Sequence, residues 1–152
     1  MKTRRKIDSR RILKVARSWV GTKFHYAGRI RKNSFNSGGV DCIGLIIEVG
    51  KEINSTYDGK NISFYGYLNY SRYPNNSEMK KFFDKYFIKI NKKDVKPGDV
   101  VYMNFNNNLE HAGILTSGGL IHCYVDAGVV VEHKMTSYLY DKIIDYYRYQ
   151  NT

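Results

Sequence analysis

The sequence is poor in proline and cysteine and has no long apolar run. Its 152 residues include two prolines and two cysteines. No stretch approaches the roughly 18 apolar residues that a membrane helix needs. The basic N-terminus is not followed by the apolar segment of a secretory signal peptide. We therefore expect no membrane span and synthesis in the cytoplasm without a recognisable export signal.

The composition that remains is that of one globular domain. Hydrophobic residues make up 42% and charged residues 26% of the chain, and tyrosine is abundant. This length is typical of a single domain with its own core, so we predict one domain over residues 1–152 with a basic segment at residues 1–11.

Positive charge is in excess, with a net charge of +11, and seven of the first fourteen residues are Lys or Arg. Such a surface attracts polyanions, including nucleic acid, anionic lipid and acidic cell-wall polymers. Solvated terminal charge is an equally good interpretation. The sequence contains no RNA-recognition module and no zinc-finger spacing, so charge alone does not predict a nucleic-acid partner.

Helical patterns precede strand patterns along the chain. Amphipathic or apolar periodicity predicts helices near residues 9–20, 42–53 and 78–87, with Asp8 or Ser9, Asp41 and Ser77 as N-caps. Residues 54–76 are polar and irregular, which predicts a surface excursion. After the turn signal at residues 96–99, five short β-rich segments follow: 100–105, 111–117, 119–125, 128–135 and 142–149. The order predicts an α+β fold with helices packed on a C-terminal antiparallel sheet.

Cys42 follows a Gly38-Gly39 pair and begins an apolar helix. At a helix start, the dipole and the unpaired N–H groups favour a thiolate, which lowers the thiol pKa from about 8.5. The same N–H groups can stabilise an oxyanion formed beside the sulfur. The alternative is a small buried hydrophobic residue, which free cysteine often is. Cys42 is therefore a candidate nucleophile.

Histidines in two consecutive predicted strands supply candidate bases. His111 opens one strand and His122 lies in the next. A hairpin at residues 117–119 would set Ile114 opposite His122, which places the two histidines obliquely on neighbouring strands. An imidazole beside a thiol, held by a second polar group, is the arrangement of an activated nucleophile. A lone strand histidine is more often structural, but two together with a helix-start cysteine favour catalysis.

A zinc site is the main chemical alternative, because Cys42, His111, His122 and Cys123 are suitable ligand types. Adjacent strand residues point to opposite faces, so His122 and Cys123 cannot readily join one tetrahedral site. We predict neither a metal nor a cofactor. A disulfide between Cys42 and Cys123 would require maturation outside a reducing cytosol.

The motifs together resemble the NlpC-type cell-wall peptidases, which are papain-like cysteine peptidases of bacteria and their phages. The resembling segments are DCIGL, HAGIL and LIHCY. ARSWVGTKFHYAGR, upstream of Cys42, and KPGDVVYM, upstream of His111, also resemble segments of this family. The resemblance spans roughly residues 12–149, and the segments YSRYP and AGVVVEH are most similar to a phage-associated branch.

This resemblance implies a papain-like fold and a Cys-His-His triad. Cys42 would be the nucleophile, His111 the general base and acid, and His122 the group that orients His111. The implied substrate is a stem-peptide amide of peptidoglycan, often the bond between D-glutamate and a diamino acid. The enzyme would act at the cell wall, and the phage-associated similarity implies a component of a phage or phage-like particle.

Tyr26, Asp41 and Gly113 are the residues from which we expect substrate contacts. The family usually has a tyrosine where this chain has Phe24, and Tyr26 is a candidate replacement. His133 has no role in the pattern and is interpreted as a surface residue. Two further functions stay open: a catalytically idle basic module that binds an anionic wall polymer, and an acyltransferase with the same Cys-His core.

Overall fold

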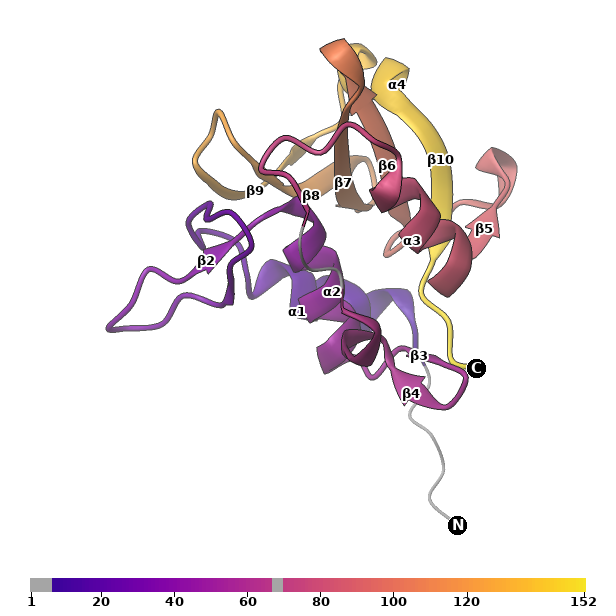
Figure 1. The fold of residues 1–152 in the computed structure, drawn as a ribbon, viewed down its shortest axis with the longest axis horizontal. Helices are drawn as coiled ribbons and strands as arrows, with labels where there is room; N and C mark the ends of the chain where they lie inside the picture. The colour runs from indigo at the N-terminus through magenta and orange to yellow at the C-terminus, as the bar shows by residue number, and fades with distance from the viewer. Residues whose placement is uncertain (1–6, 67–69) are drawn as a thin grey trace.

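The computed structural model describes residues 7–66 and 70–152, and it has the α+β architecture that the sequence predicts. Figure 1 shows α1 and α2 gathered below an antiparallel sheet, with α3 against the side of the sheet. The helices are α1 (Ser9–Arg17), α2 (Cys42–Glu52), α3 (Glu78–Tyr86) and α4 (Ser137–Lys142). Short 3₁₀ segments are η1 (Ile62–Tyr65), η2 (Lys92–Asp94) and η3 (Asn106–Asn108).

Six strands form the main sheet, in the order β5-β10-β6-β7-β8-β9. Their bounds are β5 (Ile88–Ile90), β6 (Val100–Phe105), β7 (Leu109–Leu115), β8 (Gly119–Tyr124), β9 (Val129–Lys134) and β10 (Ile143–Arg148). Strands β6 to β9 follow one another in space as in sequence, so this part of the sheet is a meander. Two small hairpins pair β1 (Arg29–Ile30) with β2 (Gly39–Val40) and β3 (Thr56–Tyr57) with β4 (Lys60–Asn61).

Helix α2 is the buried helix of the fold, and its cap positions the candidate nucleophile. The carboxylate of Asp41 accepts a hydrogen bond from the backbone N–H of Gly44 at 2.8 Å, which starts the helix at Cys42. Seven of its eleven residues are buried. An almost uniformly apolar helix must be covered on several sides, and α2 packs between α1 and strands β7 and β8. Helix α1 is capped in the same way by Asp8, as predicted.

The sheet separates two apolar clusters because its side chains alternate between faces. The larger cluster lies on the helix side and includes Ala112, Ile121 and Cys123. The smaller cluster lies on the other face, where Val101 and Leu120 pack with Leu139 of α4.

Two local expectations were wrong. The hairpin register pairs Ile114 with Ile121 instead of His122, a slip of one residue that the turn at residues 116–118 determines. Residues 54–76 are not irregular throughout, because they contain the β3–β4 hairpin and η1, whose Ile62 is buried. Ser77 is the N-cap residue of α3, as predicted, although its side chain makes no capping bond.

Part of the predicted basic segment, residues 1–6, lies outside the described residues. Within residues 7–66 and 70–152, no helix is long and apolar enough to cross a membrane.

Candidate active site

Cys42 is the first residue of α2 and lines a small cavity of about 50 Å³ together with His111 of β7. Cys42 is half-buried. The segment at residues 70–74 also contributes to the lining of this cavity. The structure therefore brings a helix-start thiol and a strand imidazole, 69 positions apart in sequence, to the same cavity.

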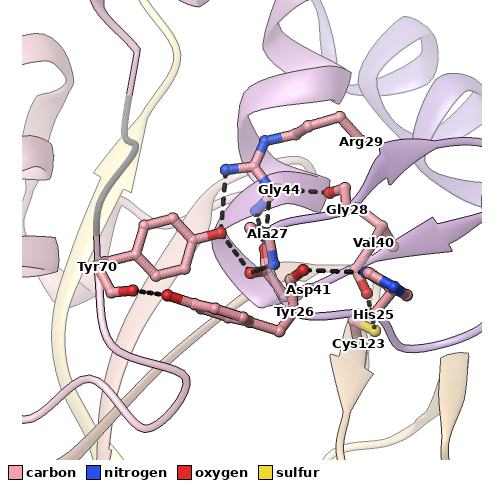
Figure 2. Close-up of polar contacts among 10 residues, drawn as sticks. All are labelled: His25, Tyr26, Ala27, Gly28, Arg29, Val40, Asp41, Gly44, Tyr70 and Cys123. Atoms are coloured by element: carbon pink, nitrogen blue, oxygen red, sulfur yellow. Dashed lines mark hydrogen bonds and ion pairs between the residues drawn. The ribbon is translucent and has the colours of Figure 1, made fainter.

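The carboxylate of Asp41 is the anchor of the loop that precedes Cys42 (Figure 2). It forms an ion pair with Arg29 at 3.2 Å and accepts bonds from the N–H groups of Ala27 and Gly44, each at 2.8 Å. The hydroxyl of Tyr70 donates to its second oxygen. Because this carboxylate is almost fully buried, these donors replace the water that it loses. Its four bonds cap α2 through Gly44 and hold two separate segments, residues 27–29 and Tyr70, at the start of that helix.

Tyr26 contacts the segment that covers the cavity (Figure 2). Its hydroxyl donates to the carbonyl of Tyr70, and the two rings meet edge to face at 5.6 Å. Phe24 lines the cavity itself, and the Arg72 guanidinium lies 5.6 Å from the centre of its ring. The phenol that reaches Asp41 is thus that of Tyr70, so substrate contacts by Tyr26 and Asp41 remain predictions.

The two candidate catalytic histidines are in direct contact. His111 Nε2 and His122 Nδ1 are 2.7 Å apart. Continuing the Ile114–Ile121 register along the strands sets Gly113 opposite His122, and His111 shares the face of Gly113. The corrected register therefore explains why both imidazoles lie on one face.

Gly113 makes room for His122. A Cβ atom at this position would lie 3.1 Å from the His122 Cβ and 2.7 Å from a methyl carbon of Leu120. Gly113 is buried, so the structure gives it a packing role under the imidazole, and its expected substrate contact stays a prediction.

Burial keeps the thiol of Cys42 protonated. Desolvation raises its pKa well above the usual value, and the negative charge of Asp41 adds to that effect. The backbone N–H groups of Ala112 and Ile43 act in the opposite direction, as expected for donors that face a thiolate. They do not outweigh burial, so the predicted lowering of the thiol pKa by the helix start is wrong for the free protein.

Burial keeps the histidines neutral as well. It lowers the pKa of His111 to about 4, and burial together with the neighbouring imidazoles lowers the pKa of His122 to about 2. Burial therefore favours a neutral thiol and neutral imidazoles in the free protein over a thiolate–imidazolium pair. A neutral thiol can act as a nucleophile only if its proton is transferred to a base, and a neutral imidazole can accept it.

Cys123 lines the same cavity, but its thiol is bonded to the backbone. It is buried, its thiol donates to the carbonyl of Val40 at 3.1 Å, and burial raises its pKa to about 12. Both cysteines are free thiols. Among the described residues, no three potential ligands are grouped to hold a metal ion.

Comparisons with known proteins agree with the fold. The model of the NlpC/P60 family matches residues 21–148. No curated protein matches the chain. The three solved structures described below are 15–17% identical to this chain, so their likeness shows the fold alone.

One similar structure is a lipoprotein-like NLP/P60 family protein of Staphylococcus aureus, with 17% identity and a TM-score of 0.60. The match covers 100% of this chain but only 45% of the Staphylococcus aureus chain, so this chain spans less than half of that protein. The NlpC/p60 domain of the peptidoglycan hydrolase SagA has 16% identity and a TM-score of 0.59, with 93% of this chain and 98% of that chain covered. RipD of Mycobacterium tuberculosis, a non-catalytic NlpC/p60 protein adapted to peptidoglycan binding, has 15% identity and a TM-score of 0.55, with 95% and 98% covered.

Proposed function

The chain belongs to the NlpC/P60 family, and from this premise we propose that it is a single-domain cysteine peptidase that cleaves stem-peptide amides of peptidoglycan. Cys42, His111 and His122 are its triad. The observation that carries the proposal is that Cys42 and His111 line one cavity while His111 is bonded to His122.

The reaction begins with transfer of the Cys42 thiol proton to His111. The Nε2 atom of His111 is occupied by His122, so Nδ1 is the atom that receives this proton. The sulfur attacks the amide carbonyl, and N–H groups at the start of α2 stabilise the oxyanion. His111 then returns the proton to the leaving amine, which leaves a thioester on Cys42. A water molecule, deprotonated by His111, hydrolyses the thioester and restores the thiol.

The proposed site of action is the cell wall, where the net charge of +11 would attract anionic polymers. The similarity of residues 70–74 and 127–133 to a phage-associated branch suggests a phage-derived protein as the source of this activity.

A binding module is the second candidate, and one observation favours it. The thiol of Cys42 is held protonated by burial, and the similar protein RipD is non-catalytic. In this case the basic surface would hold an anionic wall polymer without cleavage. An acyltransferase differs from the peptidase only in the last step, where an amine replaces water.

Digestion of purified peptidoglycan separates these functions. The peptidase releases peptides whose masses identify the cleaved bond, and the Cys42→Ala variant releases none. An acyltransferase yields products heavier by the added amine. Binding of intact walls by both forms, with no released peptide from either, would establish the binding module and contradict the peptidase.

A further inference from the structure

Three histidines form a continuous line across neighbouring strands of the sheet. His111, His122 and His133 lie on β7, β8 and β9, each eleven positions after the last. His122 Nε2 is 2.8 Å from His133 Nε2, and His122 Nδ1 is 2.7 Å from His111 Nε2. The line runs from the cavity of Cys42 to the exposed side chain of His133.

At the outer end of this line, the carbonyl of Lys134 determines which nitrogen of His133 donates a hydrogen bond. His133 Nδ1 is 2.9 Å from the carbonyl oxygen of Lys134. A carbonyl only accepts hydrogen bonds, so Nδ1 of His133 must carry a proton. In the neutral form of this imidazole only one nitrogen is protonated, so in that form Nε2 of His133 is the acceptor.

The donor and acceptor roles in His122 and His111 follow from those in His133. His133 Nε2 accepts, so His122 Nε2 must donate, and His122 is neutral because of its burial. His122 Nδ1 is therefore an acceptor, and His111 Nε2 donates to it. His111 is neutral as well, so its Nδ1 carries no proton. Nδ1 is the atom that must be unprotonated to take the proton of Cys42.

We propose that His133 is a positioning residue, which sets the tautomers of His122 and His111 so that His111 Nδ1 is the free base. This inference rests on the proposed peptidase for its catalytic consequence, but not for the proton positions themselves. The carbonyl of Lys134 determines which nitrogen of His133 is protonated. The bond from His133 to His122 then determines the protonated nitrogen in His122 and, through it, in His111.

The surroundings explain why an anchor of this kind is useful. The register pairs between β7 and β8 are Ile114–Ile121 and Leu115–Leu120, which lie on the turn side of His111 and His122. The side-chain bond between the two histidines thus joins the strands beyond these pairs. Strands β8 and β9 pair along their full length, from Gly119–Lys134 to Tyr124–Val129. His133 therefore bonds His122 from β9, the strand that is paired with β8 along its full length. The ring of Tyr124 stacks on His122, with the ring centres 5.5 Å apart.

Nitrogen NMR of the histidine rings tests the proposal directly, because protonated and unprotonated ring nitrogens resonate far apart. At neutral pH we expect the proton on Nδ1 of His133 and on Nε2 of both His122 and His111. Finding His111 protonated on Nδ1 in the free protein would overturn the proposal. This measurement needs no substrate, so it decides the proposal even if the peptidase function fails.

Three substitutions at the exposed position 133 extend the test. His133→Gln keeps an acceptor for His122 and should preserve the tautomers, with turnover within about two-fold. His133→Leu removes the acceptor, so both tautomers become populated and kcat falls about ten-fold with KM unchanged. His133→Lys offers only donors, so it should reverse both tautomers and lower kcat on the order of 100-fold.

Lys93→Gln, an exposed charge change in η2, is the matched control and should alter neither ring spectra nor turnover. If all three position-133 variants keep the wild-type tautomers of His111 and His122, the proposal is wrong. Tautomers that shift as expected in a protein that hydrolyses no peptide would uphold the role of His133 and reject the proposed peptidase.

Discussion

At the scale of single residues, the two cysteines differ in access although both thiols have raised pKa values. Both cysteines line the cavity, but Cys42 is half-buried, whereas Cys123 is 1% exposed and donates to a backbone carbonyl. The reactive form of a thiol is the thiolate, so its reactivity depends on both access and pKa. The two cysteines therefore differ more in solvent exposure than in the direction of their pKa shifts.

Alkylation with iodoacetamide should label Cys42 much faster than Cys123. Because burial raises the Cys42 pKa, its labelling should be slower than that of free cysteine at pH 7 and should still be rising above pH 9. Peptide mass mapping over a pH series measures both rates. A Cys42 rate that is already constant at pH 6 would indicate a thiolate–imidazolium pair and contradict the neutral site.

The histidines should divide by role. His111→Ala removes the base and the acid, so kcat on a stem peptide should fall on the order of 1,000-fold. His122→Ala removes only the group that orients His111, and a loss of about 10- to 100-fold is expected. His25→Gln is the control, because His25 is exposed and bonds the neighbouring carbonyl of Tyr26. Equal losses in the two alanine variants would mean that the roles are wrongly divided.

At the scale of elements, the sequence predicted what local patterns encode. Asp41 before an apolar run marked the start of α2, and the strand segment at residues 100–105 has the same bounds in the structure. The hairpin register was missed by one residue because it depends on turn geometry, which the pattern Ser117-Gly118-Gly119 leaves open. The sequence also placed His111 and His122 on neighbouring strands without determining their shared face.

The contacts of Asp41 could not be predicted from sequence. Arg29 is one of 25 basic residues and Tyr70 one of 14 tyrosines, and both reach Asp41 from distant segments. No spacing rule links them, because their meeting depends on how the loops close over the helix start. His133 was interpreted as a surface residue, which its exposure confirms, but its bond to His122 had no signal in a single strand pattern.

This network gives a prediction for the start of α2. Arg29→Ala leaves the buried carboxylate of Asp41 without its cation and should lower the free energy of unfolding by about 3 kcal/mol. Arg31→Ala is the matched control, because Arg31 pairs with Glu52 where both side chains are more than a third exposed, and should cost less than about 1 kcal/mol. Urea unfolding measures both. Equal small losses would show that Asp41 does not depend on Arg29.

At the scale of the whole molecule, the buried neutral histidines link stability to pH. The folded protein holds His111 with a pKa of about 4 and His122 with a pKa of about 2, whereas an unfolded histidine has a pKa near 6.5. Below about pH 6.5 the unfolded chain therefore binds more protons than the folded one. Stability is fully present above this pH and is lost as the pH falls toward the folded values.

Between pH 6.5 and 5, each buried histidine should lower the free energy of unfolding by up to about 1.4 kcal/mol per pH unit. His111→Gln should remove one such contribution and flatten the profile, while His25→Gln, at an exposed position, should leave the slope unchanged. Urea unfolding at a series of pH values measures the slope. A slope that His111→Gln does not reduce would mean that His111 is protonated in the folded state.

The central claim is that Cys42 is the nucleophile of a peptidase, and a matched pair of cysteine variants tests it most directly. The measurement is turnover of a soluble stem peptide by the wild type, Cys42→Ser and Cys123→Ser, with folding checked by circular dichroism. Cys42→Ser should lose at least about 100-fold in kcat, because the weaker serine nucleophile keeps the same site. Cys123→Ser should retain most of the activity, since its buried thiol is bonded to the carbonyl of Val40 and has no role in the proposed reaction. A folded Cys42→Ser variant that turns over at the wild-type rate would contradict the account.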